Sequence, residues 1–195
     1  MPLYNSQNLL DTLEKNVEQT IRKATYLQSL KGATLALAPG EGKWSVLQVL
    51  YHLNSYNNYY LPHITDALNK GRKLPAAASF KPGLIGNYFA KMMQPGNDGK
   101  IKNTMKAPKD HIAILGFSDV KAIADFIAGQ QRLLQLIKAA RKANMTRITV
   151  PISISKFIKI RLGDTFRFLI VHQQRHFVQI DNTLTALGVA WLEKA

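Results

Sequence analysis

Apolar residues recur every three or four positions along four long stretches of the chain. These stretches cover residues 5–30, 45–71, 118–142 and 164–187, and polar or charged residues occupy most of the remaining positions. One apolar face on an otherwise polar segment is the pattern of an amphipathic α-helix that buries that face. Four such helices with two long connections predict an all-α fold, a four-helix bundle. We expect a single domain over residues 1–195, because this length can bury one sizeable core.

The second helix has the best-marked start. In Ser45-Val-Leu-Gln48 the serine oxygen can accept from the Gln48 backbone amide while the Gln48 side chain reaches back, which is a capping box. Trp44 and Val49 occupy the two positions of a hydrophobic staple around it. In the fourth helix, Asp164 is predicted to cap the start.

Two connections between these helices carry their own signals. The connection from residue 71 to residue 117 is rich in glycine and proline, and one short helix at about residues 84–93 is expected within it. A connection this long usually carries function or covers a site. Before the fourth helix, apolar residues alternate over residues 147–154, which predicts a short extended segment or strand.

Composition limits the chemistry that the chain can perform. It has no cysteine, which removes disulfides, thiolate metal ligands and a cysteine nucleophile together. Any metal must therefore be held by imidazole, carboxylate or water. There is no apolar run long enough to cross a membrane, and the N-terminal residues do not form a secretory signal. We expect a cytoplasmic protein without a membrane partner.

The chain is strongly basic, with 26 Lys and Arg against 12 Asp and Glu and a formal net charge of +14. Such an excess is typical of proteins that bind nucleic acids or other anions. The basic residues are spread along the sequence, with no tight cluster beyond residues 156–161 and Arg141-Lys142, and no nucleic-acid-binding motif is recognisable. A basic surface without a specific nucleic-acid partner is the favoured interpretation.

His172 and His176 lie four residues apart in the fourth helix, which places one imidazole a turn above the other on the same face. Leu169, Ile180 and Leu187 share that face, so the pair is expected to point into the core. A buried imidazole needs a partner for each ring nitrogen. The pair could bind one metal ion if a third ligand comes from a facing helix, as in other helix bundles. Alternatively, the histidines are hydrogen-bonded core residues.

Two stretches resemble a known family. Trp44-Ser-Val-Leu-Gln-Val-Leu-Tyr-His52-Leu resembles the second helix of the DinB-like (YfiT-like) four-helix-bundle proteins. His172-Gln-Gln-Arg-His176-Phe-Val-Gln-Ile180 resembles their last helix, where His-x-x-Arg-His-x-x-Gln recurs. The order and separation of the two stretches also agree with that family.

The resemblance implies that His52, His172 and His176 bind one divalent metal ion, most often zinc or nickel, with coordination left open for water or substrate. Members of this family include metal-dependent hydrolases and thiol S-transferases that use bacillithiol, mycothiol or glutathione, and many have no assigned activity. It also implies a small-molecule thiol or another anionic cosubstrate, and a homodimer. A degenerate member that keeps the fold without the chemistry is an open alternative.

Further candidates lie near these histidines in the sequence. Tyr56, one turn beyond His52, could donate a proton or simply pack, and Gln179 could orient His176 or bridge helices. Arg175 is expected to point away from the histidine face and to form a structural ion pair. His63 and His111 are expected at the surface.

Two classes of function follow. The first is a metal-dependent enzyme, a thiol S-transferase or a hydrolase; hydrolysis is less well supported because no carboxylate is obviously placed as a general base. The second is a non-catalytic protein that binds metal, or that binds nucleic acid or other anions through its basic surface.

Overall fold

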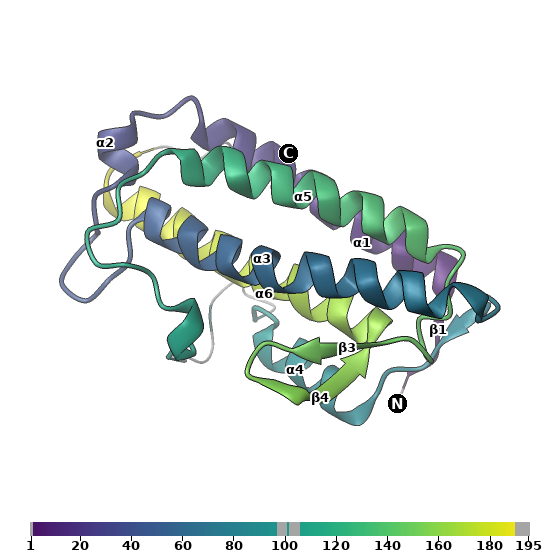
Figure 1. Ribbon diagram of the computed structural model, residues 1–195. Helices are drawn as coiled ribbons and strands as arrows, with labels where there is room; N and C mark the ends of the chain where they lie inside the picture. The colour runs from purple at the N-terminus through teal and green to yellow at the C-terminus, as the bar shows by residue number, and fades with distance from the viewer. Residues whose placement is uncertain (1, 97–100, 102–105, 190–195) are drawn as a thin grey trace.

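The computed structural model describes residues 2–96, 101 and 106–189. Four long helices form the body of the molecule, as predicted, and shorter elements fill the connections (Figure 1). In chain order the elements are β1 (Tyr4–Asn5), α1 (Ser6–Leu27), α2 (Gly32–Leu35), α3 (Val46–Lys70), the 3₁₀ turn η1 (Gly71–Lys73), β2 (Ser79–Phe80), α4 (Leu84–Met93), the 3₁₀ turn η2 (Lys109–His111), α5 (Lys121–Ala140), β3 (Thr149–Ile152), β4 (Ser155–Arg161) and α6 (Leu162–Ala186).

Two hydrophobic clusters fill the bundle, one at each end. The larger cluster contains Leu10 and Phe166, and the smaller one contains Leu50 and Phe177. Helices α1 and α6 pass from the larger cluster to the smaller one, whereas α3 and α5 pass the other way. Because α3 and α5 run parallel and side by side, residues 71–120 must bring the chain back along the bundle between them (Figure 1). The helix directions are therefore up, down, down, up.

A polar layer separates the two clusters halfway along the bundle. Each long helix contributes buried polar side chains at this height: Thr20, Asn57, Gln130 and the pair His172-Gln173. The amide groups of Asn57 and Gln130 have no hydrogen-bond partner among the described residues. The candidate site lies within this layer.

The start of α3 follows the local signals in the sequence. The Gln48 backbone amide donates to the Ser45 hydroxyl at 3.2 Å, and the Ser45 amide donates to the Gln48 side-chain oxygen at 2.9 Å. Trp44 packs against the smaller cluster, as the predicted staple requires. The capping box is therefore confirmed.

The start of α6 differs from the prediction. The helix begins at Leu162, and Asp164 is a buried residue of its first turn, not its cap. Its carboxylate accepts from the Gly83 backbone amide at 2.7 Å and from Arg167 at 3.0 Å. Gly83 lies in the connection just before α4. The carboxylate that was predicted to cap α6 therefore makes a tertiary contact with another part of the chain.

The extended segment predicted near residues 147–154 is confirmed as strand β3. It pairs antiparallel with β4, with Thr149 opposite Arg161, and the two strands form a hairpin over the C-terminal half of α3. A second, two-residue ladder joins β1 to β2 and ties the N-terminus to the long connection.

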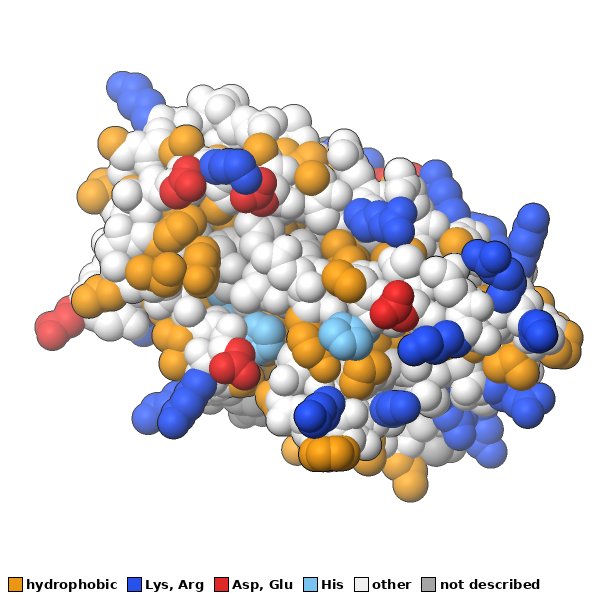
Figure 2. Space-filling model, in the orientation of Figure 1, with side chains coloured by type: hydrophobic (Ala, Val, Ile, Leu, Met, Phe, Trp, Pro, Cys, Tyr) orange, Lys and Arg blue, Asp and Glu red, His pale blue; other side chains and the backbone are white. Residues whose placement is uncertain are grey.

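The basic excess is unevenly distributed over the surface. On the face shown in Figure 2, most Lys and Arg side chains lie over the right-hand half, with few acidic side chains among them. In the described part of the chain, no helix combines the length and the hydropathy that a membrane crossing requires.

Candidate metal centre

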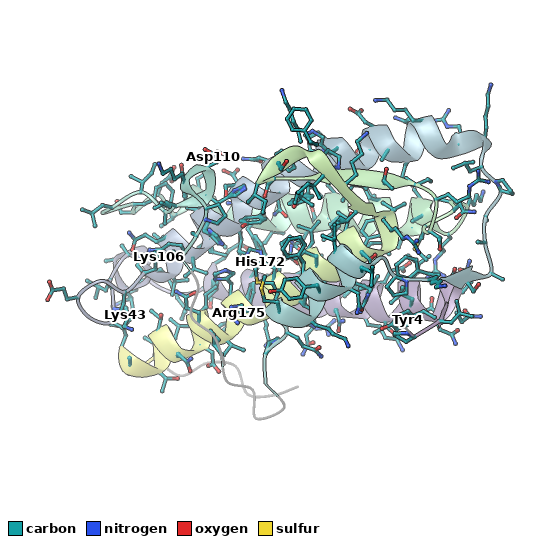
Figure 3. All side chains as sticks on the ribbon, turned by 90° about the horizontal axis from the view of Figure 1, so that it is seen from below. Tyr4, Lys43, Lys106, Asp110, His172 and Arg175 are labelled. Carbon is teal, nitrogen blue, oxygen red and sulfur yellow. The ribbon has the colours of Figure 1, made fainter. Side chains whose placement is uncertain are left out.

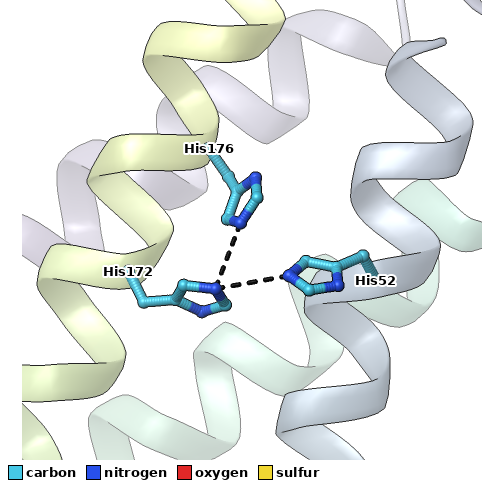
Figure 4. A group of neighbouring side chains, drawn as sticks. All are labelled: His52, His172 and His176. Carbon is cyan, nitrogen blue, oxygen red and sulfur yellow. Dashed lines mark hydrogen bonds between the residues drawn. The ribbon is translucent and has the colours of Figure 1, made fainter. Parts of the chain in front are cut away.

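Three histidines from two helices meet in the polar layer. His52 lies in the second turn of α3, and His172 and His176 lie in the middle of α6 (Figure 4). The Nε2 atom of His172 is 3.3 Å from that of His52 and 3.1 Å from that of His176. His52 and His172 are buried and His176 is partly buried. The three side chains thus present their Nε2 atoms to one point.

These separations fit a metal ion. Zinc bonds imidazole nitrogen at about 2.0–2.1 Å, so two ligands of a tetrahedral site lie about 3.3–3.4 Å apart. The observed 3.1 and 3.3 Å are close to this spacing. The three ligand atoms all lie within 4.8 Å of one another, and no carboxylate belongs to this group among the described residues.

Hydrogen bonds at the far sides of two rings set the tautomers. His52 Nδ1 lies 2.6 Å from the backbone oxygen of His111, and His176 Nδ1 lies 2.9 Å from the side-chain oxygen of Gln179. Because carbonyl oxygens only accept, both Nδ1 atoms donate. In the neutral rings, Nε2 then carries a lone pair, the state in which imidazole binds a metal.

His172 stands between the other two imidazoles. A single proton on its Nε2 could satisfy only one of its neighbours, whereas a cation at the common point would satisfy all three. Its Nδ1 is buried and has no hydrogen-bond partner within the described ranges. The donor set is therefore better explained by a metal than by hydrogen bonding among the histidines.

Burial keeps these imidazoles neutral. Desolvation lowers the pKa of His52 from 6.5 to about 4 and that of His176 to about 3. The pKa of His172 falls well below its usual value, first through burial and then through the neighbouring His176 and His52. Since only neutral imidazole binds a metal, the site is ready for a cation at neutral pH.

Tyr56 lies against the centre, as predicted. Its ring centroid is 4.4 Å from that of His172 and 5.1 Å from that of His52. Burial raises the pKa of its phenol, so the hydroxyl stays protonated at neutral pH. The ring of Phe168 stacks on the ring of His172, with 5.7 Å between the centroids and an interplanar angle of 7°.

His111 was predicted at the surface, and this is wrong. It is buried, and its ring stacks on Tyr56 at 3.9 Å between centroids. Ser55 donates to the His52 backbone oxygen, so the 2.8 Å contact between Ser55 Oγ and His111 Nδ1 has the imidazole as donor. The long connection between α3 and α5 folds over the centre at η2 and brings His111 there, which no local pattern indicates.

Arg175 lies next to the histidine group, whereas His63 lies outside it. Arg175 is buried on α6 beside His172 (Figure 3), and its charge helps to lower the pKa of both His172 and His176. His63 is half-buried near the other end of α3, with its Nδ1 2.7 Å from the Tyr59 backbone oxygen, and it is not part of the histidine group.

Comparison with known proteins supports the same layout. The family model of the DinB superfamily matches residues 17–180, a range that contains all three histidines. The chain belongs to the DinB superfamily. Among solved structures, it is similar to YfiT from Bacillus subtilis, described as a probable metal-dependent hydrolase with an unusual four-helix bundle topology. The TM-score is 0.52 at 15% sequence identity, over 95% of this chain and 89% of that one. No curated protein matches the sequence.

This DinB-superfamily chain shares the four-helix fold of YfiT, and the up, down, down, up order found here accounts for its long connection between α3 and α5. The structure brings together the three histidines that the sequence singled out, and it places Tyr56 and Gln179 beside them. The sequence did not indicate His111 because the contact depends on how the connection folds.

Proposed function

We propose that the chain is a metal-dependent enzyme in which His52, His172 and His176 hold one divalent ion, zinc or nickel. The convergence of three neutral Nε2 atoms in a buried layer is the observation that carries this proposal. A cation held there would supply a Lewis acid that lowers the pKa of a thiol or a water beside it.

Transfer of a thiol to an electrophile is the reaction that these residues support best. A thiol with a lowered pKa loses its proton to solvent and then needs no general base, and no carboxylate accompanies the histidines in the described group. His111 and Gln179 orient the ligands through Nδ1 of His52 and His176. Tyr56 keeps its proton and can donate a hydrogen bond to a developing anion. An anionic thiol cosubstrate would also be attracted by the net charge of +14.

Hydrolysis is the second candidate. It is favoured by the description of the structurally similar YfiT as a probable metal-dependent hydrolase. Hydrolysis would use the same three metal ligands as thiol transfer. The two reactions can be distinguished experimentally by which substrates the protein converts.

The test begins with metal content. Protein purified without a histidine tag, stripped and reloaded with zinc or nickel, should hold about one ion per chain by elemental analysis. The double variant His172→Ala/His176→Ala should hold almost none, while His63→Ala, outside the group, should match the wild type. Equal metal content in the double variant would disprove the site.

The second step is turnover. The zinc- and nickel-loaded proteins are supplied with glutathione, bacillithiol or mycothiol plus 1-chloro-2,4-dinitrobenzene, and separately with p-nitrophenyl acetate. Thiol conjugation above the uncatalysed rate, lost in the double variant, supports the transferase, and ester cleavage supports the hydrolase. A filled site with neither reaction would leave a metal-binding protein without the proposed activity.

A non-catalytic basic-surface protein is the alternative that the net charge of +14 favours. Binding to DNA or RNA would then weaken steeply between 50 and 200 mM salt. No nucleic-acid-binding motif is recognisable in the sequence, and we expect no retention on DNA even at 50 mM salt.

A further inference from the structure

A pocket of about 170 Å³ lies beside the metal centre. Its walls come from α3, α4, the β3–β4 hairpin and α6, so it forms only when the long connection and the hairpin are both folded onto the bundle. Tyr56 and Phe168 line it and also pack on the His172 ring, at 4.4 and 5.7 Å between centroids. A molecule in the pocket therefore lies one side chain away from the three histidines.

The burial of the lining residues distinguishes the inner end of the pocket from its mouth. Tyr56, Phe168 and Ile160 are buried and form the inner end. Lys106 and Ile154 are exposed and lie at the mouth. A ligand that fills the pocket therefore extends from these two exposed residues to Tyr56.

The chemistry of the walls differs between the two ends. The inner end is aromatic and aliphatic, and the Tyr60 hydroxyl there already accepts from the Ser153 backbone amide at 3.1 Å. No described residue is a hydrogen-bond partner of the Tyr56 hydroxyl, so it can donate to a ligand. Lys106 is the one charged residue among the lining residues that the structure describes. The pocket thus suits a molecule with an apolar body and an anionic group at its outer end.

The volume limits the size of that body. A cavity of about 150 Å³ lined by apolar side chains holds one benzene molecule. The pocket here is of similar size, which corresponds to one aromatic ring or a short alkyl chain.

We propose that this pocket binds a small organic carboxylate with an apolar body of about one aromatic ring. The carboxylate lies at Lys106, and the ring packs against Tyr56 and Phe168 at the inner end of the pocket. This inference rests on the proposed function and deepens it, because it names the chemical class of the second substrate, which the pocket would hold beside the three histidines. The binding itself needs neither turnover nor the metal.

Phenylacetate is the probe, with acetate and phenylacetamide as its partial analogues. Binding to the zinc-loaded protein is measured by ligand-observed NMR titration. Phenylacetate should bind with a Kd of about 0.1–1 mM, the range expected for a ligand of about ten non-hydrogen atoms. Acetate should bind at least tenfold more weakly, because it has no ring. Equal binding of acetate and phenylacetate would mean that the carboxylate merely binds the metal, and would overturn the proposal.

Paired variants locate the binding. Ser153→Phe should fill the pocket and weaken phenylacetate binding at least tenfold, whereas Ser155→Phe on the same hairpin does not line the pocket and should leave it within twofold. If Ser153→Phe does not fold, Ile154→Trp at the mouth and Ile158→Trp outside the pocket provide the same comparison. Equal effects within a folded pair would overturn the proposal.

A second pair tests the charge. Lys106→Gln should weaken phenylacetate binding by about two- to fivefold, as expected for one solvent-exposed ion pair, and should leave phenylacetamide unchanged. The exposed neighbour Lys109→Gln should change neither. An equal effect of Lys106→Gln on acid and amide would contradict the placement of the carboxylate.

The same samples separate this inference from the proposed function. Phenylacetate binding that is lost in Ser153→Phe, in a protein with no turnover, would support the pocket and remove the enzyme. Thiol conjugation without phenylacetate binding would keep the enzyme and overturn the pocket.

Discussion

At the scale of single residues, the tautomer and orientation of His52 and His176 are set by the hydrogen bond that each Nδ1 atom makes on the side away from the centre. His176 donates from Nδ1 to the Gln179 side chain, and His52 donates to a backbone oxygen that no substitution can remove. Gln179 is therefore the accessible test of how the ligands are oriented.

Replacing Gln179 with Leu should lower metal affinity about 10- to 100-fold, the usual effect of losing a partner that orients a metal ligand. The affinity is measured at pH 7.5 by competition with a chelating dye. Gln174→Leu, on the same helix but away from the histidines, should stay within twofold. Equal affinities for the two variants would show that Gln179 only bridges helices.

The lowered pKa values also predict how the stability of the metal-free protein depends on pH. Below pH 6.5 the unfolded chain protonates its histidines, whereas folded His52 and His176 stay neutral until about pH 4 and about pH 3. The free energy of unfolding should thus fall as the pH drops from 6.5 towards 4, by up to about 1.4 kcal/mol per pH unit for each histidine. Above pH 6.5 these two histidines should not make the free energy of unfolding depend on pH.

Urea denaturation of the stripped protein at pH 7.5, 6.0 and 5.0 measures this dependence. His176→Gln removes one titrating group, so its slope between pH 6.0 and 5.0 should be smaller than that of the wild type by up to about 1.4 kcal/mol per pH unit. Parallel curves would show that His176 titrates normally in the folded state.

At the scale of elements, local signals predicted the helices well and their contacts poorly. The short helix expected at about residues 84–93 is α4, and the capping box starts α3 as predicted. Asp164 was placed at the start of α6, but its carboxylate binds the Gly83 amide, which approaches only when α4 docks on α6. Strand β4 was not predicted, because its exposed residues become a strand through pairing with β3.

Gly86 tests the docking of α4 on α6. A Cβ atom there would lie 2.4 Å from the Asp164 Cβ, closer than side chains pack. Gly86→Ala should destabilise the protein by about 1–3 kcal/mol in urea denaturation, although alanine normally favours a helix by up to about 1 kcal/mol. Gly40→Ala, whose nearest contact would be 4.0 Å away on the flexible side chain of Lys43, should change stability by less than about 0.5 kcal/mol. A stabilising Gly86→Ala would contradict the close contact.

At the scale of the whole molecule, the polar layer interrupts a core that could otherwise be continuous. Gln130 is fully buried at this height, and neither its amide nitrogen nor its oxygen has a hydrogen-bond partner among the residues described. An unpaired buried amide costs stability, and removing both of its polar atoms removes that cost.

Gln130→Leu should therefore stabilise the protein by about 1–2 kcal/mol in urea denaturation. Gln131→Leu, exposed on the same helix, should change stability by less than about 0.5 kcal/mol. A destabilised Gln130→Leu variant would indicate that ordered water already satisfies the amide within the layer.

The sequence by itself determined the four long helices, the capped start of α3 and the two histidines on one face of α6, because helical periodicity, capping and an i, i+4 spacing are local properties. It also predicted His52, through the resemblance to a family. The tertiary structure decided the helix directions, since these depend on how residues 71–120 cross the bundle. The same crossing brought His111 over the centre and closed the pocket against the hairpin, because both depend on contacts between residues far apart in the chain.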